Sequence, residues 1–153
     1  MDTVDFNCIF CAIAARRAPA ALIYENEHAL AFLDLHPIVE GHTLIIPREH
    51  ARNLFDFDDA SGQGVMRAAR IVARAVRATY NADGMNLFQS SERAAGQDVF
   101  HFHFHLVPRF ANDGLMGTRD GGERITRWRA RGNPARAELD AIAAHIRAHI
   151  ATG

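Results

Sequence analysis

The segment His101-Phe102-His103-Phe104-His105 constrains the fold of this chain more than any other part of the sequence. Side chains alternate between the two faces of a β-strand, so an extended segment places all three histidines on one face. We predict a strand at 99–108 whose other face packs into the core through Phe100, Phe102, Phe104 and Leu106. The histidine face is predicted to carry a function, because a solvated strand face usually shows Thr, Lys, Glu and Arg instead.

The surrounding sequence predicts an α+β fold with five strands and about three helices. Strands are expected at 22–25, 29–34, 42–47, 85–89 and 99–108, and helices at 8–16, at 58 to about 82, and after Asn133-Pro134. Short turns between consecutive strands favour an antiparallel sheet over βαβ units. Gly84 and Asn133 are predicted as helix caps. Because a small sheet leaves an edge exposed, we expect a homodimer with a sheet continuous across it.

Length and composition limit the class of protein. The 153 residues fit one core, no window is apolar enough for a spanning helix, and no signal peptide is expected. A net charge of -1 gives no global attraction to nucleic acid or anionic lipid. We therefore expect a cytoplasmic protein with no nucleic-acid partner and no membrane partner. All 17 basic residues are arginine, which excludes a lysine Schiff base and a phosphate-loop lysine.

Two kinds of chemistry could use the histidine face. A single metal held by all three is disfavoured, because His101 and His105 start about 13 Å apart on a strand whereas zinc–nitrogen bonds are about 2.1 Å. A neutral imidazole is also a good nucleophile toward phosphorus. His103 is the best placed to stay neutral, because a histidine on each side disfavours its protonation. Gly96 and Gln97 suit a bound anion, through close backbone approach and an amide donor.

Residues 96–109 resemble the signature of the histidine triad family, His-x-His-x-His followed by apolar residues. Segments 8–11, 31–34 and 41–50 resemble other blocks of that family, in order and at the expected separations. The resemblance implies that 1–153 is a single domain of this family, with its core at about 6–110 and a C-terminal loop and helix at 111–153. It also implies hydrolysis or nucleotidyl transfer at the α-phosphorus of a nucleotide, with no catalytic cofactor.

The resemblance further implies roles for single residues. His103 matches the nucleophile that takes the nucleotidyl group, His105 matches a phosphate-binding neighbour, and His101 matches a residue that orders the site. Asp34 matches the carboxylate that binds the ribose hydroxyls of a purine, AMP-like nucleotide. The other implied contacts, to base and phosphate, are made by Ile9, Phe10, Leu33, Leu35, Ser90, Gln97 and Val99.

Cys8 and Cys11 form a Cys-x-x-Cys motif, a spacing that indicates metal or redox chemistry in a reducing compartment. Some bacterial members of the resembled family bind zinc with such a pair, a histidine matching His50, and the first triad histidine, here His101. Four protein ligands would close the coordination sphere, so this zinc would be structural. The alternative is two reduced thiols beside a surface histidine.

Ser90 departs from the family pattern, which usually carries Asn or Gln at this position. A hydroxyl offers fewer donors than an amide, so its contacts to the ribose or the bridging atom are expected to be weaker. Two functions therefore stay open. One is an enzyme that acts on adenosine phosphoramidates or dinucleoside polyphosphates through a covalent intermediate on His103. The other is a nucleotide-binding, zinc-stabilised partner protein with vestigial catalysis.

The arginine-rich segment 119–136 is predicted to be a mobile loop, with a second interpretation in which its arginines grip a polyphosphate tail or cover the site of a partner subunit. No chemistry is assigned to the remaining histidines, which are His28, His36, His42, His145 and His149.

Overall fold

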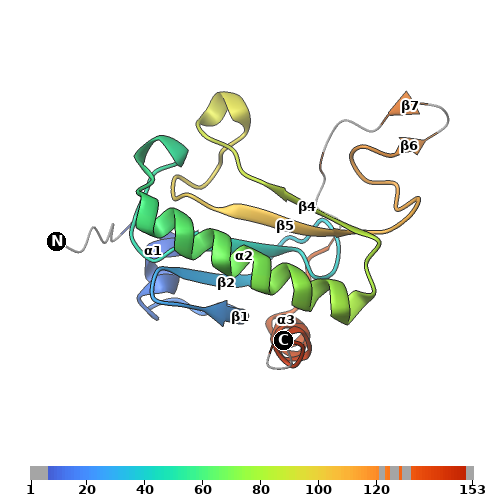
Figure 1. Cartoon of the computed structure of the whole chain (residues 1–153), viewed down its shortest axis with the longest axis horizontal. Coiled ribbons are helices and arrows are strands. Elements are labelled where there is room, and N and C mark those ends of the chain that lie inside the picture. The colour runs from blue at the N-terminus through green and yellow to red at the C-terminus, as the bar shows by residue number, and fades with distance from the viewer. Residues whose placement is uncertain (1–6, 121–122, 125–127, 129–131, 151–153) are drawn as a thin grey trace.

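A five-stranded antiparallel sheet forms the centre of the protein (Figure 1). The computed structural model describes residues 7–120, 123–124, 128 and 132–150. The strands are β1 (Leu22–Glu25), β2 (Ala29–Leu33), β3 (Thr43–Pro47), β4 (Gly84–Phe88) and β5 (Phe104–Arg109). Their order across the sheet is β1-β2-β3-β5-β4, and every neighbouring pair is antiparallel, which confirms the predicted fold class.

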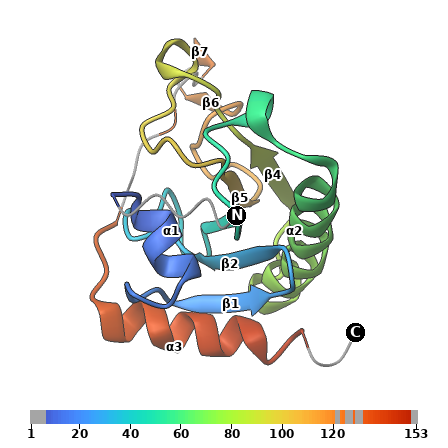
Figure 2. The same cartoon turned by 90° about the vertical axis from the view of Figure 1, so that its left-hand side faces the viewer.

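Helices cover both faces of this sheet. They are α1 (Ile9–Ala14), α2 (Asp59–Tyr80) and α3 (Arg136–Arg147), with short 3₁₀ helices η1 (Leu54–Asp56) and η2 (Arg93–Ala95). Successive residues of β2 serve opposite layers: Ala31 packs in the cluster with α2 and α3, whereas Phe32 packs with α1. Figure 2 shows α1 and α2 on opposite sides of β2, with α3 beside β1. Among the described helices, none has the length and apolar character to cross a bilayer.

Helix α2 follows from its sequence pattern. Asp58 caps its N-terminus by accepting a hydrogen bond from the Ser61 amide at 2.9 Å. Val65, Val72 and Val76 are buried along one face, and the arginines lie on the exposed face. The helix ends at Tyr80, close to the predicted end at about 82, but the predicted cap was wrong: the cap is Asn81, which adopts the left-handed conformation at φ 49°. Gly84 is instead the first residue of β4, opposite Arg109.

The predicted strand at 99–108 was partly wrong, because β5 begins only at Phe104. The Phe102 amide donates to the Ala51 carbonyl at 2.7 Å, so the segment before β5 bonds to a loop and not to a strand. Phe102 and Leu106 are buried in the core as predicted, and Phe104 packs against it. Phe100 is not in the core: it is half-buried, with the Arg52 guanidinium 4.2 Å from its ring centre.

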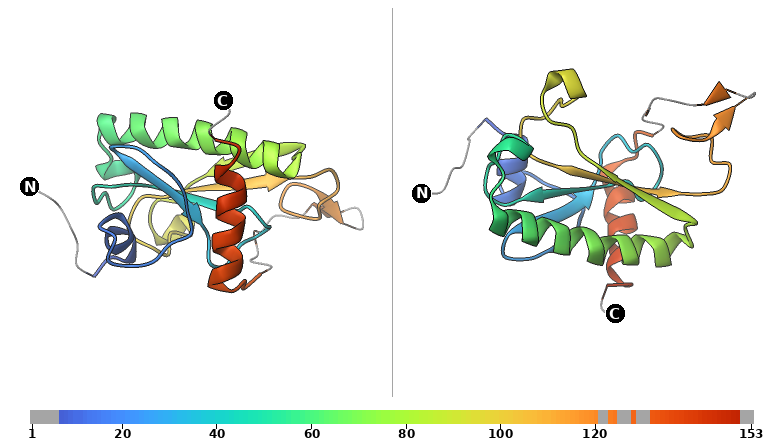
Figure 3. Two further views of the ribbon diagram at one scale, coloured as in Figure 1. Left: turned by 90° about the horizontal axis from the view of Figure 1, so that it is seen from below. Right: turned by 45° about the horizontal axis from the view of Figure 1, so that its top comes forward.

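The C-terminal part also differs from the prediction. Helix α3 begins at Arg136 after Ala135, so Asn133 is not its cap. Leu139 and Ile146 pack in the same buried cluster as α2, and Figure 3 shows the two helices running in different directions over the sheet. The 119–136 segment contains a two-stranded ribbon, β6 (Arg119–Asp120) and β7 (Glu123–Arg124), where a loop was predicted. Its Arg127, Arg129 and Arg131 lie outside the described residues.

Candidate active site

A cavity of about 250 Å³ lies between α1 and the sheet. One row of directly opposed residues crosses four strands beneath it: Leu22 faces Phe32, Phe32 faces Leu44, and Leu44 faces His105. Seven of the site residues expected from the sequence line this cavity together with His105, namely Ile9, Phe10, Leu33, Asp34, Leu35, Val99 and His103. The fold therefore brings apolar side chains, two carboxylates and three imidazoles to one cavity, since Asp98 and His36 also line it.

His103 lies on the wall of this cavity, just before β5. Its side chain is buried, with 5% exposed, so the open strand face expected from the sequence is replaced by a sheltered site. Its Nδ1 is 2.8 Å from the His101 carbonyl oxygen. A carbonyl only accepts hydrogen bonds, so Nδ1 carries the proton and the neutral ring keeps its lone pair on Nε2. That lone pair is what a nucleophilic imidazole requires.

A chain of hydrogen bonds sets the tautomer of His105. The Ile38 amide donates to His42 Nδ1 at 3.1 Å, so the neutral His42 ring carries its proton on Nε2. That nitrogen lies 2.9 Å from His105 Nδ1, which accepts its hydrogen bond, so the neutral His105 ring carries its own N–H on Nε2. Burial, with smaller contributions from charge on His103 and His42, lowers the pKa of His105 to about 3. The ring is thus a neutral hydrogen-bond donor near pH 7.

His42 is a site residue that the sequence analysis missed. It is 2% exposed, and burial lowers its pKa despite the opposing effect of Asp34. The available signal was its place beside a fully buried strand, where an imidazole needs partners. Its role depends on contact with His105, 63 residues away, which spacing alone does not predict.

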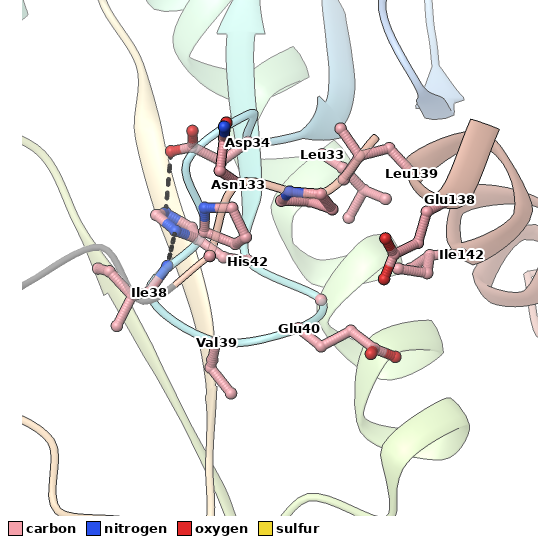
Figure 4. A pocket seen from close by; sticks show the side chains of 14 residues that line it. Leu33, Asp34, Ile38, Val39, Glu40, His42, Asn133, Glu138, Leu139 and Ile142 are labelled. Carbon is pink, nitrogen blue, oxygen red and sulfur yellow. Dashed lines mark hydrogen bonds and ion pairs between the residues drawn. The ribbon is translucent and has the colours of Figure 1, made fainter. Parts of the chain in front are cut away.

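Asp34 stands between two cavities. One is the cavity with His103, and the other, of about 340 Å³, lies between the β2–β3 loop and the start of α3. Figure 4 shows this second cavity, with dashed lines joining Asp34 to His42 and His42 to Ile38. One oxygen of Asp34 accepts from the His36 amide at 2.9 Å, and the other is 3.6 Å from His42 Nε2. Each carboxylate oxygen has a further lone pair for a ligand hydroxyl.

Aromatic rings support His105 from the β4 side. The Phe88 ring stacks on His105, with centres 4.7 Å apart, and the Trp128 ring stacks on Phe88 at 5.2 Å. The Arg109 guanidinium lies 5.4 Å from the centre of the Trp128 ring. The sequence carries no signal for this stack, because its members come from three separate segments.

Two of the expected nucleotide contacts do not line the cavity. The Gln97 side chain accepts from the Glu92 amide at 2.7 Å and donates to the carbonyls of Arg52 and Val99 at 2.6 and 3.1 Å. Its amide protons therefore already have partners, and a phosphate contact would have to compete with them. Ser90 is half-buried in the loop after β4. Their roles toward a nucleotide stay predictions.

The four residues of the expected metal site do come together. The ligand atoms of Cys8, Cys11, His50 and His101 all lie within 4.8 Å of one another. Sulfur–nitrogen distances are 3.3 to 3.5 Å, close to the value of about 3.6 Å that tetrahedral zinc bonds give. His101 Nε2 is 3.0 Å from the Pro47 carbonyl oxygen, so Nε2 carries the proton and Nδ1 faces the thiols as a ligand must. Burial lowers the pKa of His101 to about 4, which keeps the ring neutral.

The chain is similar in sequence and in structure to known proteins. Residues 15–112 match the model of the HIT domain. The chain is 41% identical over 111 residues to "Protein hit" of Bacillus subtilis, which covers 72% of this chain and 77% of that protein. A zinc-bound histidine triad family protein from Mycobacterium smegmatis superimposes with a TM-score of 0.77 at 37% identity, covering 95% and 94% of the two chains. A HIT family hydrolase from Clostridium thermocellum gives a TM-score of 0.60 at 32% identity, covering 79% and 98%.

Proposed function

Since this chain belongs to the HIT domain family, we propose that it is a nucleotide hydrolase or nucleotidyl transferase whose nucleophile is His103. The observation that carries the proposal is the hydrogen bond from His103 Nδ1 to the His101 carbonyl, which leaves the lone pair on Nε2 beside a ligand-sized cavity. Similarity to a HIT family hydrolase supports the reaction class. The substrates we propose are adenosine phosphoramidates or dinucleoside polyphosphates.

The residues of the cavity suggest how such a substrate binds. Ile9 and Phe10 of α1 and Leu33 and Leu35 at the end of β2 supply apolar walls for a purine base. Asp34 offers acceptor oxygens to the ribose hydroxyls. The phosphate then lies toward His103 and His105, at the β5 side of the cavity.

The reaction proceeds in two displacements. His103 Nε2 attacks the α-phosphorus, a bond forms between this nitrogen and phosphorus, and the leaving group departs with the electron pair of the broken bond. An amine leaving group takes up a proton from solvent as it departs, whereas a second nucleotide leaves as its phosphate anion. His105 donates its Nε2–H to a phosphate oxygen, and the His101 carbonyl stabilises the positive charge that develops on the His103 ring. Water then attacks phosphorus, loses a proton to solvent, and returns the electron pair to His103 as the nucleoside monophosphate is released.

We also propose a structural zinc ion held by Cys8, Cys11, His50 and His101. The donor set and its distances suit zinc, and the similar protein from Mycobacterium smegmatis is zinc-bound. When bound, the ion would cross-link the N-terminal segment to the segment that carries His103. It would take no part in the displacement steps.

Turnover of substrates by matched variants tests the enzyme proposal. Wild-type protein, His103→Ala and His145→Ala are assayed with adenosine phosphoramidates and dinucleoside polyphosphates. His103→Ala should lower kcat/KM by several orders of magnitude, as loss of a covalent nucleophile does elsewhere. His145 is exposed on α3 and its replacement should leave turnover unchanged. Near-wild-type turnover in His103→Ala would refute the assignment.

A nucleotide-binding partner protein with vestigial catalysis is the second candidate function. Ser90 favours it, because a hydroxyl stands where the family usually has an amide, and so do the existing partners of Gln97. This function predicts tight binding of a nucleoside monophosphate with no phosphohistidine trapped after quenching. Detection of the trapped intermediate decides for the enzyme.

We further propose a homodimer with a sheet that continues from one subunit to the next. Strand β4 is an edge of the sheet, and its Leu87 is 38% exposed. Light scattering on eluted protein should give twice the chain mass of 16.9 kDa. A mass of one chain at micromolar concentration would contradict the dimer.

A further inference from the structure

Arg136, the first residue of α3, lines the cavity that contains His103. We propose that Arg136 hydrogen-bonds the purine base, so that the site accepts the adenosine substrates proposed above but binds 6-oxopurine nucleotides, with guanine or hypoxanthine, more tightly. The inference rests on the proposed function, because it takes the cavity as the nucleotide site. It names a specificity-determining residue outside the segment that matches the family model, which ends at residue 112.

The strand register places Arg136 far from the reacting group. Leu22 of β1, Phe32 of β2, Leu44 of β3 and His105 of β5 form one row, so three strand spacings separate β1 from β5. At about 4.8 Å per spacing, the two ends of this row are roughly 14 Å apart. The Arg136 Nη2 donates to the Pro19 carbonyl at 3.2 Å, in the segment just before β1. Arg136 and His105 therefore lie at opposite ends of the cavity.

A nucleotide likewise has two different ends, the base and the phosphate. Its phosphate and base lie on opposite sides of the ribose, so a phosphate beside His103 directs the base toward β1 and α3. Figure 2 shows the start of α3 at the end of the sheet where β1 begins. The cavity lining also includes Ile13, Pro19 and Ala20, whose side chains cannot hydrogen-bond the edge of a base, and Pro19 is in contact with Arg136.

The chemistry of the guanidinium then selects the base. Arginine only donates hydrogen bonds, and the guanine edge offers two acceptors, O6 and N7, at bidentate spacing. Adenine shares N7 but presents an amino donor in place of O6, which cannot pair with Arg136. Among the described residues, the Pro19 carbonyl is the sole hydrogen-bond partner of this side chain, so further donors remain for a ligand.

Calorimetric binding of GMP, IMP and AMP tests the inference on full-length protein. Wild type should bind GMP and IMP about tenfold or more tightly than AMP, the discrimination typical of a bidentate arginine contact. In Arg136→Ala the affinities for GMP and AMP should become nearly equal, chiefly through loss of GMP affinity. 7-Deaza-GMP, which lacks the N7 acceptor, should bind wild type more weakly than GMP and bind Arg136→Ala as GMP does.

Arg147→Ala is the matched control. Arg147 also lies on α3 and also donates to a backbone carbonyl near β1, that of Leu22, but it does not line the cavity. It should keep the wild-type ratio of GMP to AMP affinity, whereas a merely structural role for Arg136 predicts the same behaviour in both variants. Equal binding of GMP and AMP by wild type, or an unchanged ratio in Arg136→Ala, overturns the inference alone. Failure of all three nucleotides to bind overturns the proposed function and the inference together.

Discussion

Acid should destabilise this protein through His105, because burial lowers the pKa of that ring from 6.5 to about 3. Above pH 6.5 the imidazole is neutral in both the folded and the unfolded chain. Between pH 6.5 and 3 the unfolded chain binds a proton that the folded ring does not, so stability is lost as pH falls through this window. From pH 8 to pH 5 the loss from His105 alone is about 2 kcal/mol.

Urea unfolding isolates the contribution of His105 to the pH dependence of stability. The free energy of unfolding is measured from pH 8 to pH 5, at one zinc concentration, for wild type, His105→Asn and His145→Asn. His105→Asn should be less stable than wild type at pH 8 but should lose about 2 kcal/mol less on acidification. His145→Asn, which changes an exposed ring, should follow the wild-type pH dependence. If His105→Asn and wild type lose the same free energy between pH 8 and pH 5, the buried-imidazole explanation is refuted.

Three further perturbations have defined outcomes. Gly64→Ala should destabilise by about 1–3 kcal/mol, because its new Cβ would lie 3.1 Å from Cγ of His28 and closer still to its Cβ. Gly62→Ala, where the nearest atom is 3.5 Å away, should instead gain up to about 1 kcal/mol; equal urea midpoints would contradict the packing argument. His42→Leu should lower kcat by about 10- to 100-fold with little change in KM, because leucine has no donor to position His105; an unchanged kcat excludes that role. Protein purified without chelator should carry one zinc per chain and lose thermal stability in EDTA; elemental analysis well below one zinc per chain counts against the metal site.

Local signals sufficed for much of the fold. The turn between β1 and β2 was predictable at Asn26, whose side-chain oxygen accepts from the amides of His28 and Ala29 at 2.9 and 2.8 Å. The apolar stripe likewise predicted a helix from 58, and α2 begins at Asp59. These features depend on residues within a few positions of one another, so the sequence contains them directly.

The start of β5 depends on a distant contact. Alternating histidine and phenylalanine residues predict extended chain from 99 onward, and they do not reveal that the Phe102 amide pairs with Ala51 in a loop. Asn133-Pro134 is a helix-start pattern by local rules, yet α3 begins only at Arg136. At β5 a tertiary contact moves a boundary that local propensity places elsewhere.

In the candidate site, too, some residues could be found from local spacing and others depend on distant contacts. The His-x-His-x-His and Cys-x-x-Cys spacings indicated the proposed nucleophile and two of the four residues of the Cys/His cluster, because such patterns lie within a few residues. His42 and Arg136 were not found, since their importance arises only when the sheet brings His42 to His105 and when α3 docks beside Pro19. The partners of Gln97 were equally invisible, because Arg52 is 45 residues away.

Mass spectrometry of protein quenched during turnover tests the nucleophile most directly. Wild type mixed with an adenosine phosphoramidate and stopped within the first turnovers should carry one added adenylyl group, located by peptide mapping on His103. His103→Ala should carry none. An adduct on His101 or His105, or rapid wild-type turnover with no adduct at any time point, would contradict the mechanism.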